Sequence, residues 1–400
     1  MADHPTRDDI RLLDGEFYGN DPIEPYEWMR ANAPVYYDDQ AQVWGITLHE
    51  DILNVSKDSG TYCSGEGSRP EAGSYTPSMI NMDDPDHRKR CTLVNRGFSP
   101  RRVADHEPKI RAICNELVDK VAAKGQCDFV RDIAAPLPMI VIGDMLGVLP
   151  KDRDRLLQWS EDMLGATSAT ADGETLKRAV MAGADYSQYA LDVIAKRRVD
   201  PTLDDLIGIL TNAKIDGESL NEEALIHESL LILVGGDETT RHVMTGGMLE
   251  LIRHPEQRQM LLDDPSKIPT AIEEMLRWVS PIKNMNRTAT RDVELRGQQI
   301  RKGDKLLLLY HSANRDERVF DEPTRFNIER DPNEHVAFGG YGRHFCLGAS
   351  LAKLELRLFF EEVLPRMADL EVADGAKLAL RPSNFIAGLE EMQVTFSPGA

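Results

Sequence analysis

The sequence predicts a mainly α-helical protein with small β-sheets, and three observations support this fold class. Helical periodicity dominates residues 101–280. Residues 35–47 are rich in β-forming side chains, and residues 292–310 contain short alternating runs punctuated by glycine, so both segments resemble hairpins. The sequence contains no repeat and no Gly/Ser-rich linker. We therefore expect residues 1–400 to form a single domain.

Composition favours a globular protein of the cytoplasm. Hydrophobic residues make up 41% of the chain and charged residues 28%, which provides apolar material for a sizeable core. The N-terminus has no basic or apolar signal region, and prolines interrupt the apolar stretch at 134–149, so we expect no export signal and no membrane anchor. The cysteines are scattered, without CxxC spacing, which suits a reducing cytoplasm.

The chain has a net charge of −20, which repels polyphosphate at long range, so we expect no nucleic-acid binding. A basic run nevertheless lies within residues 88–102. It forms either a solvated helix face or a docking patch for an acidic partner. Its members are Arg88, Lys89, Arg90, Arg96, Arg101 and Arg102.

The longest helical pattern covers residues 221–253. Asn221 is a favourable N-cap, and two glutamates follow it in the first turn. One apolar face continues through Ile226, Leu230, Leu233 and Val234. Gly235-Gly236 lies in the middle, where each glycine costs about 1 kcal/mol relative to alanine. Close passage of the helix past a bulky flat ligand would explain this pair.

Cys346 stands at the start of a second amphipathic helix. Its leucines are Leu347, Leu351, Leu354 and Leu358, with Lys353, Glu355 and Arg357 interleaved. Backbone N–H groups at a helix N-terminus lower the pKa of a thiol and favour the thiolate. A cysteine in this position is an inert thiol, a nucleophile or a metal ligand.

The loop before this cysteine, FGGYGRHF, favours a metal ligand. Its glycines leave room for a large planar group, and Arg343 and His344 supply positive donors. The pattern resembles the haem-binding loop of cytochromes P450, where glycines, a basic residue two before the cysteine and a glycine two after it recur. One position departs from the family, because Gly339 stands where an aromatic residue is usual and Phe338 lies one earlier.

The resemblance implies a cytochrome P450 fold, a triangular and predominantly α-helical domain. It also implies a haem b cofactor, with Cys346 as the ligand of the iron. Phe338, Gly340 and Gly348 match positions around the haem.

Haem propionates need cationic or donor partners in a buried site. The positions that match the family are His344, Arg287 and His87. The family commonly has an arginine four residues after that histidine, where this chain has Cys91. Either Arg90 reaches across from a neighbouring face, or one propionate has one partner fewer.

A second motif, Glu274-Met275-Leu276-Arg277, places a glutamate and an arginine on one helix face. Most such pairs are solvated and contribute a few tenths of a kcal/mol. The ExxR pair of the family is instead buried against the segment that leads to the cysteine loop, here 314–326. The resemblance makes Arg325 the candidate third member and implies a structural role that helps haem incorporation.

The third motif, GGDETT at 235–240, interrupts the apolar part of the long helix. It resembles the oxygen-activating motif of the family, which maps an acid onto Glu238 and an alcohol onto Thr239. Cleavage of the O–O bond requires two protons, which a hydroxyl that orients water and a carboxylate that relays protons can deliver. The resemblance therefore makes these two residues catalytic.

The reaction implied is monooxygenation, in which one atom of O₂ enters an unactivated C–H bond and the other leaves as water. The chain has no flavin or nicotinamide fingerprint, so we expect a ferredoxin and its reductase to supply electrons. The basic run, together with Arg343 and Lys353, forms a plausible docking surface for an acidic ferredoxin.

The motif variants FGGxGxHxC and YHSANRDE resemble actinobacterial enzymes that oxidise the terminal methyl of the cholesterol or cholest-4-en-3-one side chain, in some cases on to the acid. The alternatives are a hydroxylase of another lipid, such as a branched fatty acid or terpenoid, and a haem-thiolate binding or sensor protein without turnover. Apolar candidates for substrate contact are Ile80, Met82, Leu233, Val234, Met285 and Ile386.

Overall fold

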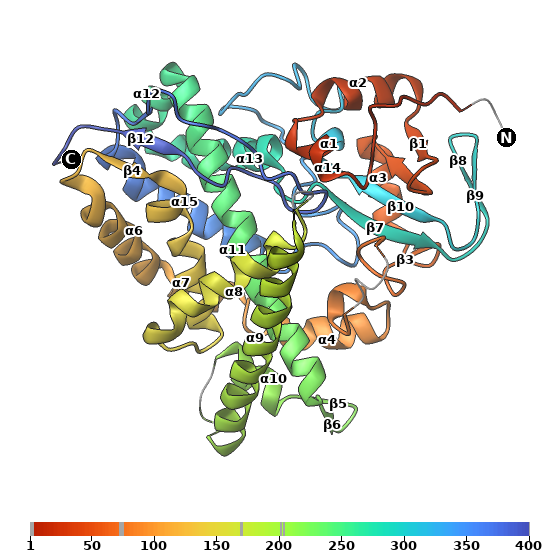
Figure 1. Ribbon diagram of the computed structural model, residues 1–400, viewed down its shortest axis with the longest axis horizontal. Coiled ribbons are helices and arrows are strands. Elements are labelled where there is room, and N and C mark those ends of the chain that lie inside the picture. The colour runs from red at the N-terminus through yellow and green to blue at the C-terminus, as the bar shows by residue number, and fades with distance from the viewer. Residues whose placement is uncertain (1–3, 72–75, 169–170, 201, 203–204, 400) are drawn as a thin grey trace.

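Helices form most of the protein, and the largest sheet lies at one corner of a roughly triangular outline (Figure 1). The computed structural model describes residues 4–71, 76–168, 171–200, 202 and 205–399. The expected fold class, mainly α with small sheets, is confirmed.

The α-helices are α1 Gly15–Gly19, α2 Ile23–Asn32, α3 His49–Lys57, α4 Asp86–Asn95, α5 Pro100–Asp105, α6 Glu107–Ala122, α7 Pro136–Met145, α8 Arg153–Gly165, α9 Gly173–Val199, α10 Leu206–Asn212, α11 Glu222–Arg253, α12 Pro255–Asp263, α13 Ile268–Val279, α14 Tyr310–Ala313 and α15 Ala349–Arg366. Shorter helical turns are η1 Met79–Asn81, η2 Phe129–Ala134, η3 Pro150–Asp152 and η4 Pro265–Lys267.

Both expected hairpins are present. The first pairs β1 with β2 in antiparallel register, and the second pairs β8 with β9 across a turn at Arg296-Gly297, where both residues have positive φ. The larger sheet has the strand order β1-β2-β10-β7-β3. The strands are β1 Val35–Asp38, β2 Val43–Ile46, β3 Tyr62–Cys63, β4 Gln126–Asp128, β5 Lys214–Ile215, β6 Glu218–Ser219, β7 Asn284–Ala289, β8 Val293–Leu295, β9 Gln298–Ile300, β10 Lys305–Leu309, β11 Glu371–Val372 and β12 Gln393–Thr395.

Helix α11 crosses the middle of the molecule and starts where the sequence predicts (Figure 1). The Asn221 side chain accepts a hydrogen bond from the backbone N–H of Ala224, as an N-cap does. The helix packs against α7, α13 and α15. A Cβ on Gly236 would lie 2.9 Å from the side chain of Ile142 in α7, so close packing of the two helices requires this glycine.

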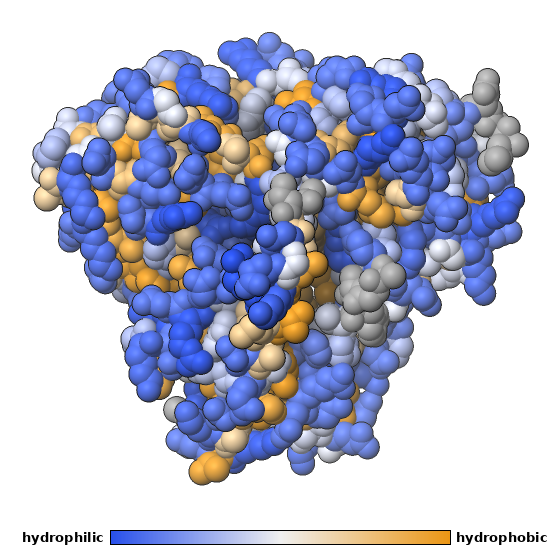
Figure 2. All heavy atoms as spheres, viewed as in Figure 1, coloured by the Kyte–Doolittle hydropathy of each residue, from blue (hydrophilic) through white to orange (hydrophobic). Residues whose placement is uncertain are grey.

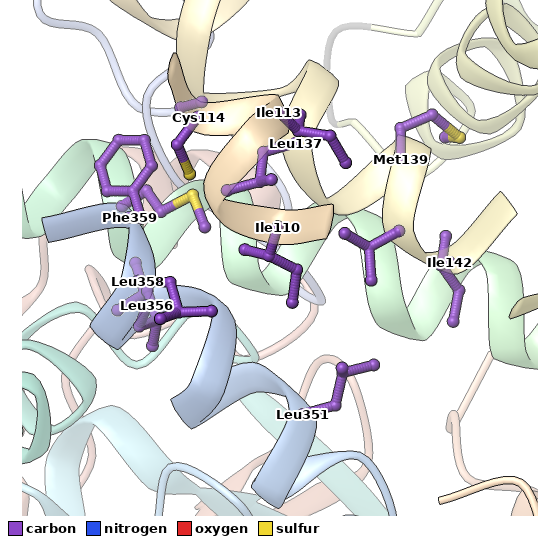
Figure 3. Close-up of a cluster of buried hydrophobic side chains, with 14 of the residues drawn as sticks. Ile110, Ile113, Cys114, Leu137, Met139, Ile142, Leu351, Leu356, Leu358 and Phe359 are labelled. Carbon is purple, nitrogen blue, oxygen red and sulfur yellow. The ribbon is translucent and has the colours of Figure 1, made fainter. Parts of the chain in front are cut away.

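The main core lies where α6, α7 and α15 meet beside α11. Buried side chains from these helices point toward one another (Figure 3). The labelled residues are Ile110, Ile113 and Cys114 of α6, Leu137, Met139 and Ile142 of α7, and Leu351, Leu356, Leu358 and Phe359 of α15. This core holds α15, and therefore the loop in front of it, against the rest of the protein.

The surface is mostly hydrophilic, and hydrophobic residues appear in several separate patches on the face shown in Figure 2. Helix α9 carries the exposed apolar residues Leu176, Val180, Met181 and Val199. Among the described residues, no helix is both long enough and apolar enough to span a membrane.

Candidate active site

A cavity lies between α11 and the loop that contains Cys346. Helix α4, the turn η1 and strand β7 complete its wall with α15. Most of the lining is apolar, and it comes from segments far apart in the sequence. Representative apolar residues are Met79, Phe98, Leu231, Ile232, Val243, Ile282 and Leu351.

The cysteine loop is positioned by its own backbone. The N–H of Cys346 donates to the carbonyl of Phe338, and the two atoms are 2.9 Å apart. Gly339 between them adopts φ +96°, which a side chain rarely tolerates. This explains the glycine at the position where an aromatic is usual. Phe338 itself lines the cavity.

Gly340 and Gly342 have a different role from the one expected. A Cβ on Gly342 would lie 1.9 Å from the carbonyl oxygen of Ser56, and one on Gly340 would meet the side chain of the same serine at 2.3 Å. These glycines therefore allow the loop to pack on α3, and neither lines the cavity, whereas Gly348 does.

Cys346 lines the cavity, three residues before α15 begins at Ala349. The backbone N–H groups of Gly348 and Ala349 interact with its sulfur, as expected at a helix start. The expectation of a lowered pKa is nevertheless wrong for the protein alone. Cys346 is exposed toward the cavity, but the protein atoms crowded around its sulfur exclude water, which raises the pKa of the thiol and outweighs these two amides. A cation bound at the sulfur would reverse this balance by favouring the thiolate.

One arginine and two histidines gather at one edge of the cavity. The rings of His87 and His344 are 4.1 Å apart between centroids, and Arg287 lies near His344. Burial, with the charges of Arg287 and His87, lowers the pKa of His344 to about 3. Burial likewise lowers the pKa of His87. Bound carboxylates would relieve this crowding of donors and positive charge.

Arg90 does not reach this edge. Its guanidinium donates to Glu228 of α11 over 3.0 Å, and Cys91 lines the cavity in its place. The structure therefore decides between the two possibilities left by the sequence, because the position four residues after His87 supplies no cation.

These features fit a haem. The Cys346 sulfur would ligate the iron, and the apolar walls suit the porphyrin ring. Arg287 and the two histidines at the edge would supply hydrogen-bond donors to the propionates. A long helix that faces a cysteine across an apolar cavity is the arrangement of a haem-thiolate oxygenase.

On the α11 side, Thr239 and Glu238 lie in different surroundings. Thr239 lines the cavity, and its hydroxyl donates to the carbonyl of Gly235 over 2.8 Å. Thr240 also lines the cavity. Glu238 is fully buried behind the wall and does not line it.

Three basic side chains surround Glu238. Arg241 contacts its carboxylate at 2.5 Å, Arg381 at 3.1 Å and His242 at 3.3 Å. Burial opposes ionisation, but the charge of Arg241, the nearby ring of His242 and the charge of Arg381 together lower the pKa of Glu238 well below its ordinary value. The carboxylate is therefore ionised at neutral pH.

Two further buried carboxyl groups escaped sequence interpretation. Burial and the neighbouring charge of Glu238 raise the pKa of Asp237. Glu355 of α15 was read as part of a polar face, yet it is 2% exposed and lines the cavity, and burial raises its pKa well above the ordinary value. The position of Asp237 next to Glu238 in the motif could have indicated that it is buried. Nothing in the sequence indicated this for Glu355, because its spacing also suits a solvated helix face.

The ExxR pair is buried, but its third member differs from the expected one. Arg277 contacts Glu274 at 2.7 Å and donates to the carbonyls of Asn314, Pro323 and Arg325. The guanidinium that completes the group belongs to Arg330, 3.1 Å from Glu274. The Arg325 side chain is exposed and pairs with Glu322. Arg325 was the wrong residue, since only its backbone takes part.

Only some of the residues predicted to contact substrate lie in the cavity wall. Ile80 and Met285 line the cavity, whereas Met82, Leu233, Val234 and Ile386 are absent from its wall. Leu233 is fully buried in the core. The helix face was assigned two residues out of phase, because α11 presents Leu231 and Ile232 instead. Ile386 pairs through its backbone with Ile282, which does line the cavity.

Comparisons with known proteins agree with this arrangement. The sequence profile of the family Cytochrome P450 matches residues 36–377. A steroid C26-monooxygenase from Mycolicibacterium smegmatis is 48% identical over 401 residues, 100% of this chain and 99% of that protein. A methyl-branched lipid omega-hydroxylase from Mycobacterium bovis is 38% identical over 366 residues, 88% of this chain and 84% of that protein. A Mycobacterium marinum cytochrome P450 solved with pseudoionone matches with a TM-score of 0.90 and 33% identity, covering 99% of this chain and 100% of that one.

The chain therefore belongs to the cytochrome P450 family. It is a monooxygenase, an oxidoreductase that uses a haem-iron cofactor. Enzymes of this family take electrons from redox partners and bind hydrophobic substrates. This result decides against the alternative of a sensor protein without turnover.

Proposed function

We propose that this enzyme hydroxylates the terminal methyl of a steroid side chain, such as that of cholesterol or cholest-4-en-3-one. The observation that carries the proposal is the apolar cavity opposite Cys346, in a chain 48% identical over its full length to a steroid C26-monooxygenase. A terminal methyl has no polar handle, so walls of Ile232, Val243 and Ile282 suit it. The whole chain acts as one catalytic domain in the cytoplasm, where its five free cysteines stay reduced.

Haem b is the cofactor in this proposal. Cys346 would ligate its iron, His87, Arg287 and His344 would hold its propionates, and Phe338 and Gly348 would border the ring. The bound haem supplies the activation of O₂.

Thr239 and Glu238 have different roles in proton transfer in this proposal. The Thr239 hydroxyl stands at the cavity wall, where it orients a water for proton transfer. Glu238, held ionised behind α11, accepts protons that arrive from solvent. Its route outward follows Arg241 toward Glu161 and Arg381 toward the exposed Glu390. The two guanidinium groups keep their own protons, so water that enters along this route brings the proton to Glu238, and rotation of its side chain carries that proton to the cavity side.

An acidic ferredoxin, reduced by its reductase, is the electron donor we propose. Arg88, Arg96 and Arg101 are exposed, and α5 packs against α15, the helix that follows Cys346. Arg343 and Lys353 add charge beside the cysteine loop, although they pair with Asp84 and Glu273. Arg90 does not contribute to this patch, since its guanidinium pairs with the buried Glu228.

The docking patch is tested by Arg96→Gln/Arg101→Gln. We expect the KM for ferredoxin to rise about tenfold and its salt dependence to weaken, with kcat at saturating ferredoxin unchanged. Lys302→Gln, an exposed cation in the β8–β9 hairpin region, is the matched control. Equal KM values for the double variant and the control would show that ferredoxin docks on another surface.

Substrate class is tested by difference spectra of the haem-loaded enzyme. Cholest-4-en-3-one should shift the iron to high spin as water leaves it, and turnover with ferredoxin and reductase should yield the terminal alcohol. The 38% identical lipid omega-hydroxylase favours a second candidate, a methyl-branched fatty acid. A response to that acid and none to any steroid would replace the steroid proposal with the lipid one.

A further inference from the structure

The turn η1 is a short piece of cavity wall held by a side chain from outside its own segment. Met79 and Ile80 of this turn line the cavity. The backbone N–H of Met79 donates to Oε1 of Glu228 in α11 over 2.8 Å. Within its own segment, Asn81 accepts from the N–H of Ser68 and donates to the carbonyl of Thr76. Glu228 is therefore the link from this wall to the long helix.

The same oxygen of Glu228 receives a second donor from α4. Nη1 of Arg90 lies 3.0 Å from Oε1, the glutamate side chain is fully buried and the arginine side chain is 13% exposed. Helix α4 also carries His87 and Cys91, which line the cavity. One carboxylate oxygen thus joins η1, α4 and α11 at the cavity border.

Apolar packing alone would hold this wall at a smaller cost in desolvation free energy than the Glu228–Arg90 pair does. Oε2 of Glu228 and Nε of Arg90 are buried, and neither has a hydrogen-bond partner among the described residues. A buried ion pair rarely stabilises a fold more than apolar residues of similar volume would. What it supplies is a directed bond, so the backbone of Met79 is fixed at one place relative to α11.

We infer that Glu228 is a positioning residue for the substrate, which holds the Met79–Asn81 turn against α11 and is itself held by Arg90. The inference rests on the proposed function in one respect, namely that an apolar substrate occupies the cavity beside Met79 and Ile80. It also explains why Arg90 points to this glutamate and not to the cavity edge formed by His87, Arg287 and His344.

The main variant is Glu228→Leu/Arg90→Leu, which removes the bond to Met79 without leaving a buried charge unpaired. We expect the Kd for cholest-4-en-3-one to rise about tenfold, since one charge-assisted hydrogen bond that orders the wall is lost. We also expect product to spread from the terminal methyl to neighbouring carbons. Glu228→Gln keeps an acceptor for the amide of Met79 and should show a smaller change in both quantities.

A purely structural role would not give this pattern. The reduced, CO-bound Soret band and the affinity for imidazole should stay as in the wild type, because neither needs the η1 wall. The matched control is Glu223→Gln, which removes the same charge from an exposed position of α11. Wild-type Kd and product distribution in the double variant would overturn the inference, as would equal changes in the control.

A second probe separates this inference from the proposed function. 4-Phenylimidazole binds the iron through nitrogen and places its ring in the space beside it, so its affinity relative to imidazole reports the wall without any steroid. If the wild type responds to no steroid, the proposed function fails. The inference still stands if the double variant loses about tenfold in this ratio, and falls if the ratio is unchanged.

Discussion

Two glutamates of α11 are equally buried, yet their surroundings push their acidity in opposite directions. Glu238 faces Arg241, Arg381 and His242, and its pKa is well below the ordinary value. Burial raises the pKa of Glu228 to about 7, because a single cation, Arg90, and the N–H of Met79 only partly offset the loss of water.

Burial alone therefore does not decide what a carboxyl group on this helix does. The number of cations around it decides whether it is a permanent anion or a group that gains a proton near neutral pH. Glu238 stays ionised and can hold a proton only transiently before passing it on, whereas Glu228 is suited to hold a wall. Changes at each residue should therefore differ in kind, with turnover affected at one and binding at the other.

The largest effect is expected at Glu238. Glu238→Gln keeps the size of the side chain but removes the proton acceptor surrounded by Arg241 and Arg381. Turnover should fall about 100-fold, the lower range for loss of a general acid–base group. Product formed per NADH consumed should fall as well, while the Kd for substrate stays near that of the wild type. These are measured by product chromatography and spectral titration.

The comparison also supplies the control for that experiment. Glu228→Gln makes the same chemical change ten positions earlier on the same helix, and its product formed per NADH consumed should fall far less than that of Glu238→Gln. Similar losses of turnover in both variants would show that the two carboxylates are not distinguished by their cations.

A smaller effect is expected at Arg381, which acts on Glu238 from the C-terminal part of the chain. Arg381→Gln removes one of two guanidinium partners and leaves Arg241 in place. With less positive charge nearby, the pKa of Glu238 rises, so the acidic limb of the pH–kcat profile should move to higher pH. We expect the loss of kcat to be largest at acid pH and small near neutral pH, where Arg241 still holds Glu238 ionised.

Arg381→Lys is the conservative partner of this variant, because it returns the charge without the planar guanidinium. It should restore most of the acidic limb. A profile that is identical in the wild type, the glutamine variant and the lysine variant would remove Arg381 from the role of positioning Glu238.

Local patterns in the sequence predicted much of the fold and the site. Asn221 fixed the start of α11, and the glycine-rich loop and the leucine spacing around Cys346 indicated a loop followed by a helix. The structure places His87, Arg287 and His344 together at one cavity edge, as the family pattern implied. Such features depend on residues close in the sequence or on fixed motif spacing.

The parts that sequence could not predict depend on which distant side chains meet. Arg330 rather than Arg325 completes the ExxR group, because a loop turns the later arginine toward Glu274. Arg381 reaches Glu238 from 143 positions away. The phase of α11 was also misjudged, because Leu231 and Leu233 are both apolar and only tertiary packing decides which one faces the cavity.

The smallest effect we expect is on stability at Glu228, where the raised pKa has a definite sign. Between its ordinary pKa of 4.5 and its folded pKa of about 7, Glu228 binds a proton in the folded state but not in the unfolded state. Its contribution to stability is therefore full below the lower value and is lost as pH rises through the upper one. The groups that face it are Arg90 and Cys91 of α4 and the amide of Met79.

Glu228→Gln cannot ionise, so it should escape this loss. Between about pH 6 and about pH 8, the free energy of unfolding of the wild type should fall by about 1 kcal/mol relative to the variant. Urea unfolding followed by tryptophan fluorescence at the two pH values measures this, with the exposed Glu223→Gln as control. Parallel pH curves for the wild type and Glu228→Gln would mean that Arg90 keeps Glu228 ionised, as Arg241 and Arg381 do for Glu238, and the contrast between the two glutamates would then be lost.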